Sequence, residues 1–514
     1  MNNNALILAK TKQLSVTEQA KHLVAIDLGS NSFHLIIARE QDGCLQILHR
    51  QKQSIAIAAG LNSAGFLSDK IIEKAVDCLH EFNLAIDGLP CCISRIVATY
   101  ALRTAKNIEQ FKEKAQQVLP YPIEVISGKL EAELIYKGVA HTQPLHGTTF
   151  IIDIGGGSTE LVVGHKFSIF LADSMSMGCI SFQQQFFLNG EITATAMNNA
   201  QLYAAEQLTG VADRYRVANC KVTLGTSGSI KVIAQVMLEL YGDKKITVKR
   251  LNRLVKQLIQ WQHCDNIPLH SLEENRRPLL AGAVAILSSC FNLLGIKQMH
   301  FSLGGLREGV LYDLSQSRTD IDTRERTIQN LSHLYHVDQA FNQGVLQQIT
   351  FMNQQLPQKK LLTQDELSFL TWAAQLHEIG ISINSKKRQR HSAYIIKHSD
   401  MPGFSENEQL IIAQLVRNHR GKIKFKHTNN VAQNKQTSIK TVRIPLLTQL
   451  LRLAIIFTHG RVQSQVTPIT VNHIVHTDNG ERIEVNLNSQ THLLDTLIAE
   501  VEVQASIGLV LVIK

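Results

Sequence analysis

Two segments of the chain share one pattern of apolar and polar positions. Residues 22–40 (HLVAIDLGSNSFHLIIARE) and 150–164 (FIIDIGGGSTELVVG) each contain an apolar run, an Asp, a Gly/Ser turn and a second apolar run. Apolar runs of this length on either side of such a turn predict two strands joined as a hairpin. The equivalent residues Asp27 and Asp153 lie far apart, which leaves room for helices in each copy. The repeat therefore predicts two similar α/β lobes that face each other.

Two further Gly/Ser turns end apolar strands and begin helical patterns. They lie in TLGTSGSIKV at residues 223–232 and in FSLGGLREGVLYD at residues 301–313. A helix that begins after such a turn presents free backbone N–H groups, which bind anions. We therefore expect both turns to face an anionic ligand, with Ser227 and Gly228 in the first of them.

The second part of the chain has a different pattern. From about residue 319 the sequence reads as helices with many histidines and few glycines. The last segment alternates apolar and polar positions around a DNG turn at residues 478–480, which predicts a hairpin followed by a helix and a strand. We expect a flexible arm (1–21), two α/β lobes (22–124 and 125–318), a helical domain (319–460) and a small α+β domain (461–514).

Composition narrows the class of protein. With 514 residues, 44% hydrophobic and 18% charged, the chain has the composition of a multidomain globular protein. Its formal charge of +9 favours an acidic partner, although an excess of this size is also compatible with ordinary solvation. The eight cysteines form neither a CxxC metal pattern nor a disulfide framework, which favours the reducing cytoplasm.

Two apolar stretches raise the question of membrane targeting. The N-terminal one spans only four residues, which is too short for the core of a signal peptide. Residues 279–296 are more apolar, but Gly, Ser, Cys and Asn interrupt them. We expect a buried helix there and no transmembrane segment.

The chemistry of the repeated turns suits a phosphate. Gly155, Gly156 and Gly157 remove every Cβ that would keep an oxyanion from successive backbone N–H groups. Ser158 and Thr159 add hydroxyl donors, as Ser30 and Ser32 do in the first hairpin. Asp27 and Asp153 would repel a phosphate, so they suggest a divalent cation or an attacking water beside it. Asp153 and Glu160 are close enough in sequence to share one ion across the hairpin.

These residues resemble the actin-like and sugar-kinase-like superfamily and, within it, the exopolyphosphatase and guanosine pentaphosphate phosphohydrolase family. The resemblance covers about residues 22–313 and continues more weakly to about residue 460. The stretches that carry it are VAIDLGSNSFHLII, ATYALRTAKN, VISGKLEAELIYKGVAHT, IDIGGGSTELVVG, MGCISF, LGTSGSIK and GGLREGVLYD. It implies two actin-like (ribonuclease-H-like) lobes.

The resemblance also implies roles for single residues. Glu131 matches the catalytic base, Arg103 and Arg307 match arginines that reach the phosphate chain, and Asp153 and Glu160 match the Mg²⁺-associated carboxylates. The first phosphate loop corresponds to Asp27, Gly29, Ser30, Asn31 and Ser32. One departure concerns the base, because the family often has a second Glu before it and an Arg after the following Ala. This chain has Leu130 and Glu133 there.

The helical domain looks like the HD phosphohydrolase fold without its full set of metal ligands. The chain has the pair His377-Glu378 in place of His-Asp, and LLRLAIIF offers no Asp for the last ligand. His336, His377 and His419 either bind a metal as neutral imidazoles or belong to helices that kept the fold and lost the metal. Basic stretches at 386–391 and 417–427 are either a solvated face or a track for a long polyanion.

The expected activity is Mg²⁺-dependent, processive hydrolysis of the terminal phosphoanhydride of inorganic polyphosphate. The alternative is removal of the 5′-terminal phosphate of guanosine pentaphosphate, which the same residues could perform. The basic stretches favour the polymer, because a single nucleotide needs no extended track. A kinase or nucleotide-driven switch and a non-catalytic polyanion-binding module are two further classes. The resemblance implies a homodimer, and we expect no nucleic-acid partner.

Overall fold

A computed structural model describes most of the chain. The described residues are 21–41, 44–62, 64–90, 92–145, 147–218, 220–315, 321–356, 361–425, 443–458, 470–477, 480–486, 493–506 and 509–513. They divide into two compact units, Met1–Ile321 and Asp322–Lys514. The predicted arm lies outside the described residues except for Lys21, and so do residues 478–479 of the predicted DNG turn.

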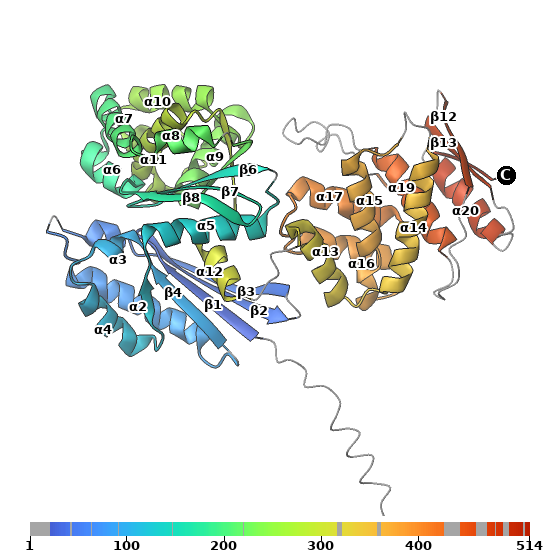
Figure 1. The fold of residues 1–514 in the computed structure, drawn as a ribbon, viewed down its shortest axis with the longest axis horizontal. Coiled ribbons are helices and arrows are strands. Elements are labelled where there is room, and N and C mark those ends of the chain that lie inside the picture. The colour runs from blue at the N-terminus through green and yellow to red at the C-terminus, as the bar shows by residue number, and fades with distance from the viewer. Residues whose placement is uncertain are drawn as a thin grey trace, which may run out of the picture. The chain divides into compact units, whose positions relative to one another are not determined.

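The first lobe is a five-stranded sheet covered by helices (Figure 1). Its strands lie in the order β3-β2-β1-β4-β5, with β1, β2 and β3 antiparallel and β4 and β5 parallel to β1. The elements are β1 (Lys21–Leu28), β2 (Ser32–Gln41), β3 (Cys44–Ser54), η1 (Ile57–Gly60), α2 (Asp69–Ile86), β4 (Cys92–Ala98), α3 (Tyr100–Thr104), α4 (Ile108–Val118) and β5 (Ile123–Val125).

The second lobe repeats this plan with one more strand, in the order β10-β11-β9-β6-β7-β8. Its strands are β6 (Thr148–Ile154), β7 (Thr159–His165), β8 (Ser168–Met175), β9 (Val222–Thr226), β10 (Ile246–Thr247) and β11 (Gln298–Phe301). Its helices are α6 (Cys179–Phe186), η2 (Leu188–Gly190), α7 (Ala194–Leu208), α8 (Ala212–Val217), α9 (Ser227–Tyr241), α10 (Val248–Trp261), η3 (Cys264–Asn266), η4 (Glu274–Arg276) and α11 (Arg277–Leu294).

The internal repeat predicted from the two hairpins is confirmed. In each lobe an antiparallel three-stranded meander is extended by parallel strands on the side of its first strand. Asp27 and Asp153 are both the next-to-last residue of that first strand. Directly across each hairpin, Asp27 pairs with His34 and Asp153 pairs with Glu160. The repeat therefore places two polar pairs at equivalent ends of the two sheets.

Two helices, α5 (Gly128–Thr142) and α12 (Leu306–Leu314), lie between the sheets (Figure 1). Leu134 of α5 packs with Val310 of α12 against the first sheet, while other residues of α5 pack against the second. The two helices touch through glycines, since a Cβ on Gly309 would lie 1.8 Å from the backbone oxygen of Leu134. This contact fixes the position of α5 relative to α12, and residues of both helices line the cavity of the first unit.

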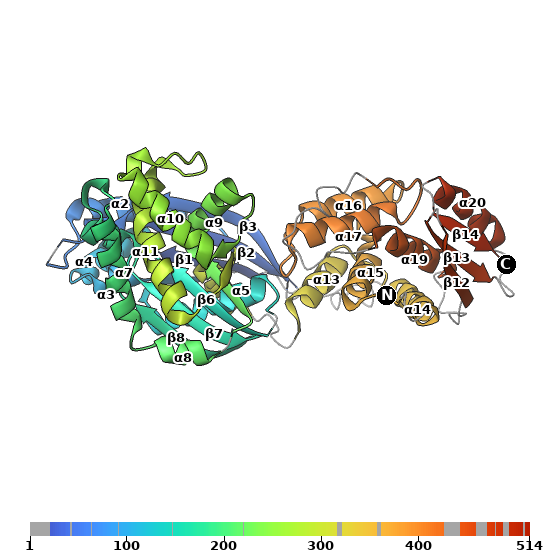
Figure 2. The same ribbon diagram turned by 90° about the horizontal axis from the view of Figure 1, so that it is seen from above.

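Helix α11 forms the centre of the second lobe's core. It lies among α7, α9 and α10 on one face of the sheet (Figure 2). The segment Glu274–Leu294 is long and apolar enough to cross a membrane by length and composition, and 72% of its most apolar window is buried inside the structure. Gly295 ends α11 with φ 71°, a left-handed conformation that glycine adopts readily.

The second unit is helical with one small sheet. Its helices are α13 (Thr323–Leu334), α14 (Gln339–Gln355), α15 (Gln364–Leu376), η6 (Ile379–Ser382), α16 (Arg388–His398), α17 (Glu406–Asn418), α19 (Ile444–Phe457) and α20 (Leu494–Ala505). Strands β12 (Thr470–Thr477), β13 (Gly480–Asn486) and β14 (Val510–Ile513) form the sheet in that order. Helices and sheet share one apolar core. The predicted helices, and the hairpin, helix and strand after them, are thus confirmed, whereas their division into two domains and the likeness to HD proteins stay predictions.

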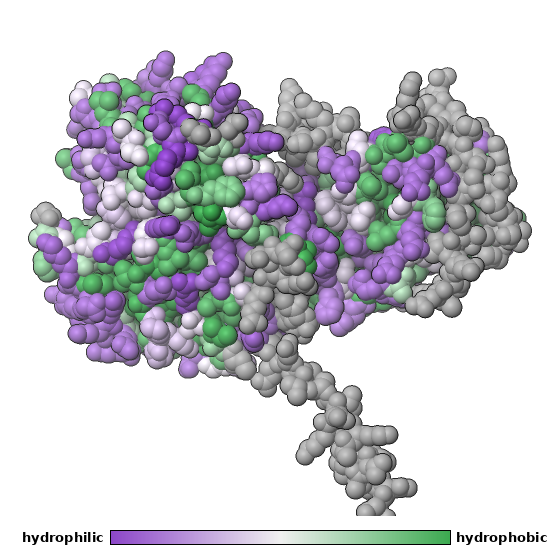
Figure 3. Space-filling view, viewed as in Figure 1, coloured by the Kyte–Doolittle hydropathy of each residue, from purple (hydrophilic) through white to green (hydrophobic). Residues whose placement is uncertain are grey.

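Exposed apolar side chains are spread over both units. Figure 3 shows hydrophobic areas interrupted by hydrophilic ones on the visible face. The large exposed apolar residues include Leu84, Phe170, Leu202 and Leu303, and they come from unrelated elements. Leu303 is 80% exposed and follows β11. It is the residue of this group that matters for the cavity described next.

Candidate active site

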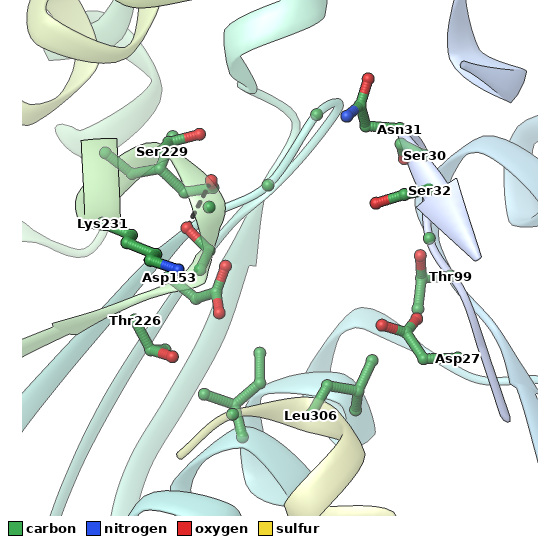
Figure 4. A pocket seen from close by; sticks show the side chains of 18 of the residues that line it. Asp27, Ser30, Asn31, Ser32, Thr99, Asp153, Thr226, Ser229, Lys231 and Leu306 are labelled. Atoms are coloured by element: carbon green, nitrogen blue, oxygen red, sulfur yellow. Dashed lines mark hydrogen bonds between the residues drawn. The ribbon is translucent and has the colours of Figure 1, made fainter. Parts of the chain in front are cut away.

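A cavity of about 350 Å³ opens between the two lobes of the first unit. Figure 4 shows Asp27, Ser30, Ser32 and Thr99 on one wall, with Asp153, Thr226, Ser229 and Lys231 opposite them. Of the predicted site residues, those that line the cavity are Asp27, Gly29, Ser30, Asn31, Ser32, Glu131, Asp153, Gly155, Gly156, Ser158, Glu160, Ser227, Gly228 and Arg307. Arg103, Gly157 and Thr159 are not among its lining residues.

The first turn, between β1 and β2, is held by backbone hydrogen bonds. The carbonyl oxygen of Ser30 accepts from Ala58 N at 3.0 Å, and that of Asn31 accepts from Ala56 N at 2.8 Å. Both donors belong to the segment around η1, which follows β3. The carbonyls therefore point into the lobe, and the seryl side chains line the cavity (Figure 4).

The second turn, between β6 and β7, is packed tightly against its surroundings. Gly155 N donates to Ser158 O at 2.9 Å, while the carbonyl of Gly156 accepts from Ile180 N at 2.9 Å. A Cβ on Gly156 would lie 2.9 Å from the side chain of Ser30, so the two turns approach each other across the cavity. Glycine is needed there because the opposite loop occupies the space of a side chain.

Two predicted phosphate ligands of this turn, Gly157 and Thr159, have structural contacts. A Cβ on Gly157 would lie 2.2 Å from the ring of Tyr100, so this glycine leaves room for an aromatic side chain. Thr159 is buried, and its hydroxyl donates to the carbonyl of Met177 at 2.7 Å. Thr159 thus ties β7 to the segment before α6, and its part in phosphate binding stays a prediction.

Asp153 and Glu160 face each other across the β6–β7 hairpin. Both are buried, and Ser174 Oγ donates to Glu160 Oε1 at 2.8 Å. Burial, with Glu131 and Asp27 adding negative charge, raises the pKa of Asp153 to about 8. Burial likewise raises the pKa of Glu160, and Glu131 and Asp153 raise it further. Carboxylates crowded in this way favour the protonated form of one another, and a bound cation would offset their charge.

The carboxylates fit a divalent cation. Burial raises the pKa of Asp27 to about 7, and its Oδ1 is buried without a hydrogen-bond partner among the described residues. Mg²⁺ prefers carboxylate oxygens and water as ligands. Asp153 and Glu160 could hold such an ion, while Asp27 approaches the cavity from the opposite wall (Figure 4).

Glu131 lies in the first turn of α5, directly at the cavity. Ser127 caps this helix by accepting a hydrogen bond from Leu130 N at 3.2 Å, which fixes the turn that carries Glu131. Burial raises the pKa of Glu131, and the nearby Arg103 guanidinium lowers it. A carboxylate with a raised pKa in a polar cavity is suited to accept a proton from water.

Arg103 contacts Glu131 rather than the cavity. Its Nη1 lies 3.0 Å from Glu131 Oε2 and donates to the carbonyl of Ile126 at 2.8 Å. The predicted contact with a phosphate chain is untested, but the structure gives Arg103 a second role. It orients the carboxylate at position 131.

The cavity also contains cations that the sequence analysis missed. Lys52, Lys231 and Arg276 line it together with the predicted Arg307. They come from β3, α9 and η4, three elements with no common local pattern. Lys231 could have been found, because it lies one turn after Ser227 in the predicted anion-binding helix. Lys52 and Arg276 lie in no sequence pattern that predicts an anion-binding site.

Ser227 begins α9 in an unusual conformation. Its φ is +81°, which is rare outside glycine, and its hydroxyl donates to the carbonyl of Ile154 at 2.8 Å. Strained residues of this kind are concentrated at functional sites. The start of α9 is thereby tied to the end of β6, next to Gly155.

The three histidines considered as metal ligands differ in their surroundings. His377 and His419 are buried with ring centroids 5.1 Å apart, whereas His336 is exposed. Burial and the neighbouring His377 lower the pKa of His419 well below its usual range, so its ring is neutral. Metal binding by these residues stays a prediction.

Comparisons with known proteins identify the family that this chain is similar to. The model of the Ppx/GppA phosphatase family matches residues 36–318, and the model of Ppx/GppA phosphatase domain III matches residues 323–505. The chain is 36% identical over 447 residues to a guanosine-5′-triphosphate,3′-diphosphate pyrophosphatase of Pseudoalteromonas translucida, covering 86% of this chain and 88% of that protein. A protein of the same name from Vibrio vulnificus is 34% identical, with 94% and 95% covered.

Solved structures show the same fold over more than half of the chain. An exopolyphosphatase from Cytophaga hutchinsonii matches with a TM-score of 0.53 and 23% identity, over 58% of this chain and 99% of that one. The Aquifex aeolicus PPX-GPPA enzyme matches with a TM-score of 0.50 and 24% identity, over 57% and 99%. At such identities the likeness concerns the fold alone. The family models and the relatives at about 35% identity show that the chain belongs to the Ppx/GppA phosphatase family and is a phosphoanhydride hydrolase, with the actin-like fold of the solved structures.

Proposed function

We propose that the chain hydrolyses the 5′-terminal phosphoanhydride of guanosine pentaphosphate, releasing orthophosphate and guanosine tetraphosphate. The observation that carries this choice of substrate is the name shared by the curated relatives, which match at about 35% identity over most of both chains. This proposal reverses the preference for polyphosphate expected from the basic stretches of the sequence.

The cavity residues account for the reaction as follows. Glu131 accepts a proton from a water molecule, whose oxygen attacks the terminal phosphorus while the bond to the bridging oxygen breaks. Backbone N–H groups of the two facing turns and the Arg307 guanidinium hold the phosphoryl oxygens. Mg²⁺ held by Asp153 and Glu160 would offset the negative charge of the transferred group.

Two features of the cavity suit a nucleotide with phosphates at both ends. Lys52, Lys231 and Arg276 provide positive charge beyond that of Arg307, enough for a second phosphate group. Leu303 lines the same cavity and is 80% exposed. An apolar side chain in a polar cavity gains contact area from a flat base, and polyphosphate has no such group.

Polyphosphate is the second candidate. The cations of the cavity would serve a polymer of phosphates as well as a 3′-diphosphate. The apolar Leu303 would make no favourable contact with it, and for this reason we place the nucleotide first.

The reaction is tested with guanosine pentaphosphate in ¹⁸O-labelled water. We expect one ¹⁸O atom in the released orthophosphate and unlabelled guanosine tetraphosphate. Glu131→Gln should lower kcat by about 10²–10⁴-fold. Glu133→Gln is the matched control, because Glu133 lies on the same helix, pairs with Lys129 and does not line the cavity. Label in the nucleotide product, or equal rates for both variants, would refute the proposed reaction.

A further inference from the structure

The position opposite Asp27 differs between the two repeated hairpins. In the second lobe Glu160 faces Asp153, and in the first lobe His34 faces Asp27. From the contacts of this ring we infer that His34 is a positioning residue of the first phosphate-binding turn. It is held as the neutral Nε2–H tautomer by Arg307 and donates to Ser32, so that the Ser32 hydroxyl keeps its own proton for a phosphate oxygen. This inference rests on the proposed phosphoanhydride hydrolysis.

The tautomer follows from the two hydrogen bonds of the ring. Nδ1 of His34 lies 3.2 Å from Nη1 of Arg307. A guanidinium carries only donors, so Nδ1 must accept and cannot carry a proton. The remaining ring proton of a neutral imidazole is then on Nε2. Arg307 therefore determines which side of the His34 ring is the donor.

The second hydrogen bond of the ring determines that the Ser32 hydroxyl is an acceptor. Nε2 of His34 lies 2.9 Å from Ser32 Oγ. Since Nε2 is the donor, Oγ accepts, and the single hydroxyl proton of Ser32 is not used in this bond. Ser32 is buried at the end of the first turn and lines the cavity (Figure 4). Its proton can be donated to an oxyanion in the cavity.

The surroundings of His34 keep the ring neutral. Burial, with the cations Arg307, Lys52 and Arg276 adding positive charge, lowers the pKa of His34 to about 3. These three come from α12, β3 and η4, and the carboxyl opposite the ring is Asp27 of β1. A protonated ring would lose the bond from Arg307, because Nδ1 would then be a donor facing a donor.

The two hairpins thus have complementary chemistry at equivalent positions. The acidic pair of the second lobe suits a cation. A carboxylate at position 34 would place negative charge beside the phosphate-binding turn, whereas a neutral ring donates a hydrogen bond without adding charge. The end of the hairpin in the second lobe therefore suits a cation, and the equivalent end of the hairpin in the first lobe suits an anion.

The tautomer is measured directly by long-range ¹H–¹⁵N correlation spectra of the full chain labelled with ¹⁵N-histidine. The His34 signal is assigned by its loss in His34→Gln. We expect the pattern of a neutral Nε2–H imidazole at every pH from 5.5 to 8. A protonated ring or the Nδ1–H tautomer in this range would overturn the inference. This readout requires no substrate, so it is independent of the proposed function.

Kinetics test whether the ring acts through Ser32. His34→Leu should lower kcat/KM about 10-fold or more, and His34→Gln, whose amide can donate to Ser32, should recover most of that loss. In a Ser32→Ala background, His34→Leu should cost much less than in the wild type. Additive losses, or equal losses for Gln and Leu, would contradict the inference. Orthophosphate release is measured from guanosine pentaphosphate and from polyphosphate, because the predicted pattern holds for whichever substrate is turned over.

Discussion

The guanidinium of Arg103 lies 3.0 Å from the carboxylate of Glu131. The same guanidinium donates a hydrogen bond to the carbonyl of Ile126 and so connects Glu131 to the segment between the two lobes. Glu131 projects from α5, the helix that packs against both sheets. The proposed catalytic base is therefore fixed from two sides, by its helix and by an ion pair from α3. This relationship gives the first prediction.

Arg103→Gln should raise the pKa of Glu131, because burial raises it and Arg103 opposes that effect. A catalytic base with a higher pKa stays protonated up to a higher pH, so the acid limb of the plot of kcat/KM against pH should move to higher pH. The profile is measured by orthophosphate release between pH 5 and 9. Arg103→Lys should leave the limb near its wild-type position, and an unchanged limb in Arg103→Gln would contradict the role of the ion pair.

Binding of Mg²⁺ should strengthen as pH rises. The pKa values of Asp27 and Asp153 are about 7 and about 8 in the metal-free protein. A cation must displace protons from such carboxyls, so affinity increases through this range and levels off above it. Calorimetry in buffers of different ionisation enthalpy reports the protons released. Binding without proton release at pH 7 would contradict the predicted coupling.

Asp153→Asn should stabilise the metal-free protein at alkaline pH. The raised pKa of Asp153 means that its contribution to folding is favourable below about pH 4 and is lost as pH rises through about 8. An amide carries no charge to bury, so the variant avoids this cost. In EDTA at pH 8.5 we expect its Tm to exceed the wild-type value by about 1–3 °C.

The same comparison at pH 5 is the control for this prediction. Folded Asp153 is then protonated, and only the part of its stabilising contribution that is lost between about pH 4 and pH 5 is missing, so the gap in Tm should be clearly smaller than at pH 8.5. A lower Tm for the variant at pH 8.5 would show that Asp153 stabilises the fold in its charged form.

Gly309→Ala should disrupt the contact between α5 and α12. A Cβ there would lie 1.8 Å from the backbone oxygen of Leu134, which cannot move away without shifting the helix. We expect a loss of about 2 kcal/mol or more in the free energy of unfolding and a fall in kcat. Gly210→Ala is the matched control, since nothing lies within 4 Å of its Cβ position. Denaturant unfolding of both variants measures the difference.

Leu303→Ser should separate the two candidate substrates. Loss of the apolar contact should lower kcat/KM for guanosine pentaphosphate by about 5–30-fold, in line with about 1–2 kcal/mol of apolar burial. Hydrolysis of polyphosphate should be unchanged, because the polymer offers no apolar surface. Equal losses with both substrates would mean that Leu303 stabilises its own loop and does not contact the guanine ring of the substrate.

Much of the fold and part of the site could be predicted from local sequence. The hairpins follow from apolar runs around Gly/Ser turns, and the pairing of Asp153 with Glu160 follows from the strand register. Both features depend on residues within one supersecondary unit. The Asp27–His34 pair also lies within one hairpin, but no sequence pattern indicated a functional role for His34.

Contacts between distant segments could not be predicted in this way. Lys52 and Arg276 reach the cavity from β3 and η4, and only the tertiary fold brings them together. The bond of Arg103 to Glu131 joins α3 to α5, and the sequence motif of Arg103 gave no indication of it. The resemblance implied which residues matter but not which of them contact each other.

The most direct measurement is the ratio of kcat/KM for guanosine pentaphosphate to that for long-chain polyphosphate, with one preparation of the full chain and saturating Mg²⁺. The proposed function predicts a ratio well above one, with guanosine tetraphosphate as the nucleotide product and both activities lost in Glu131→Gln. A ratio well below one would contradict it and assign the cavity to the polymer.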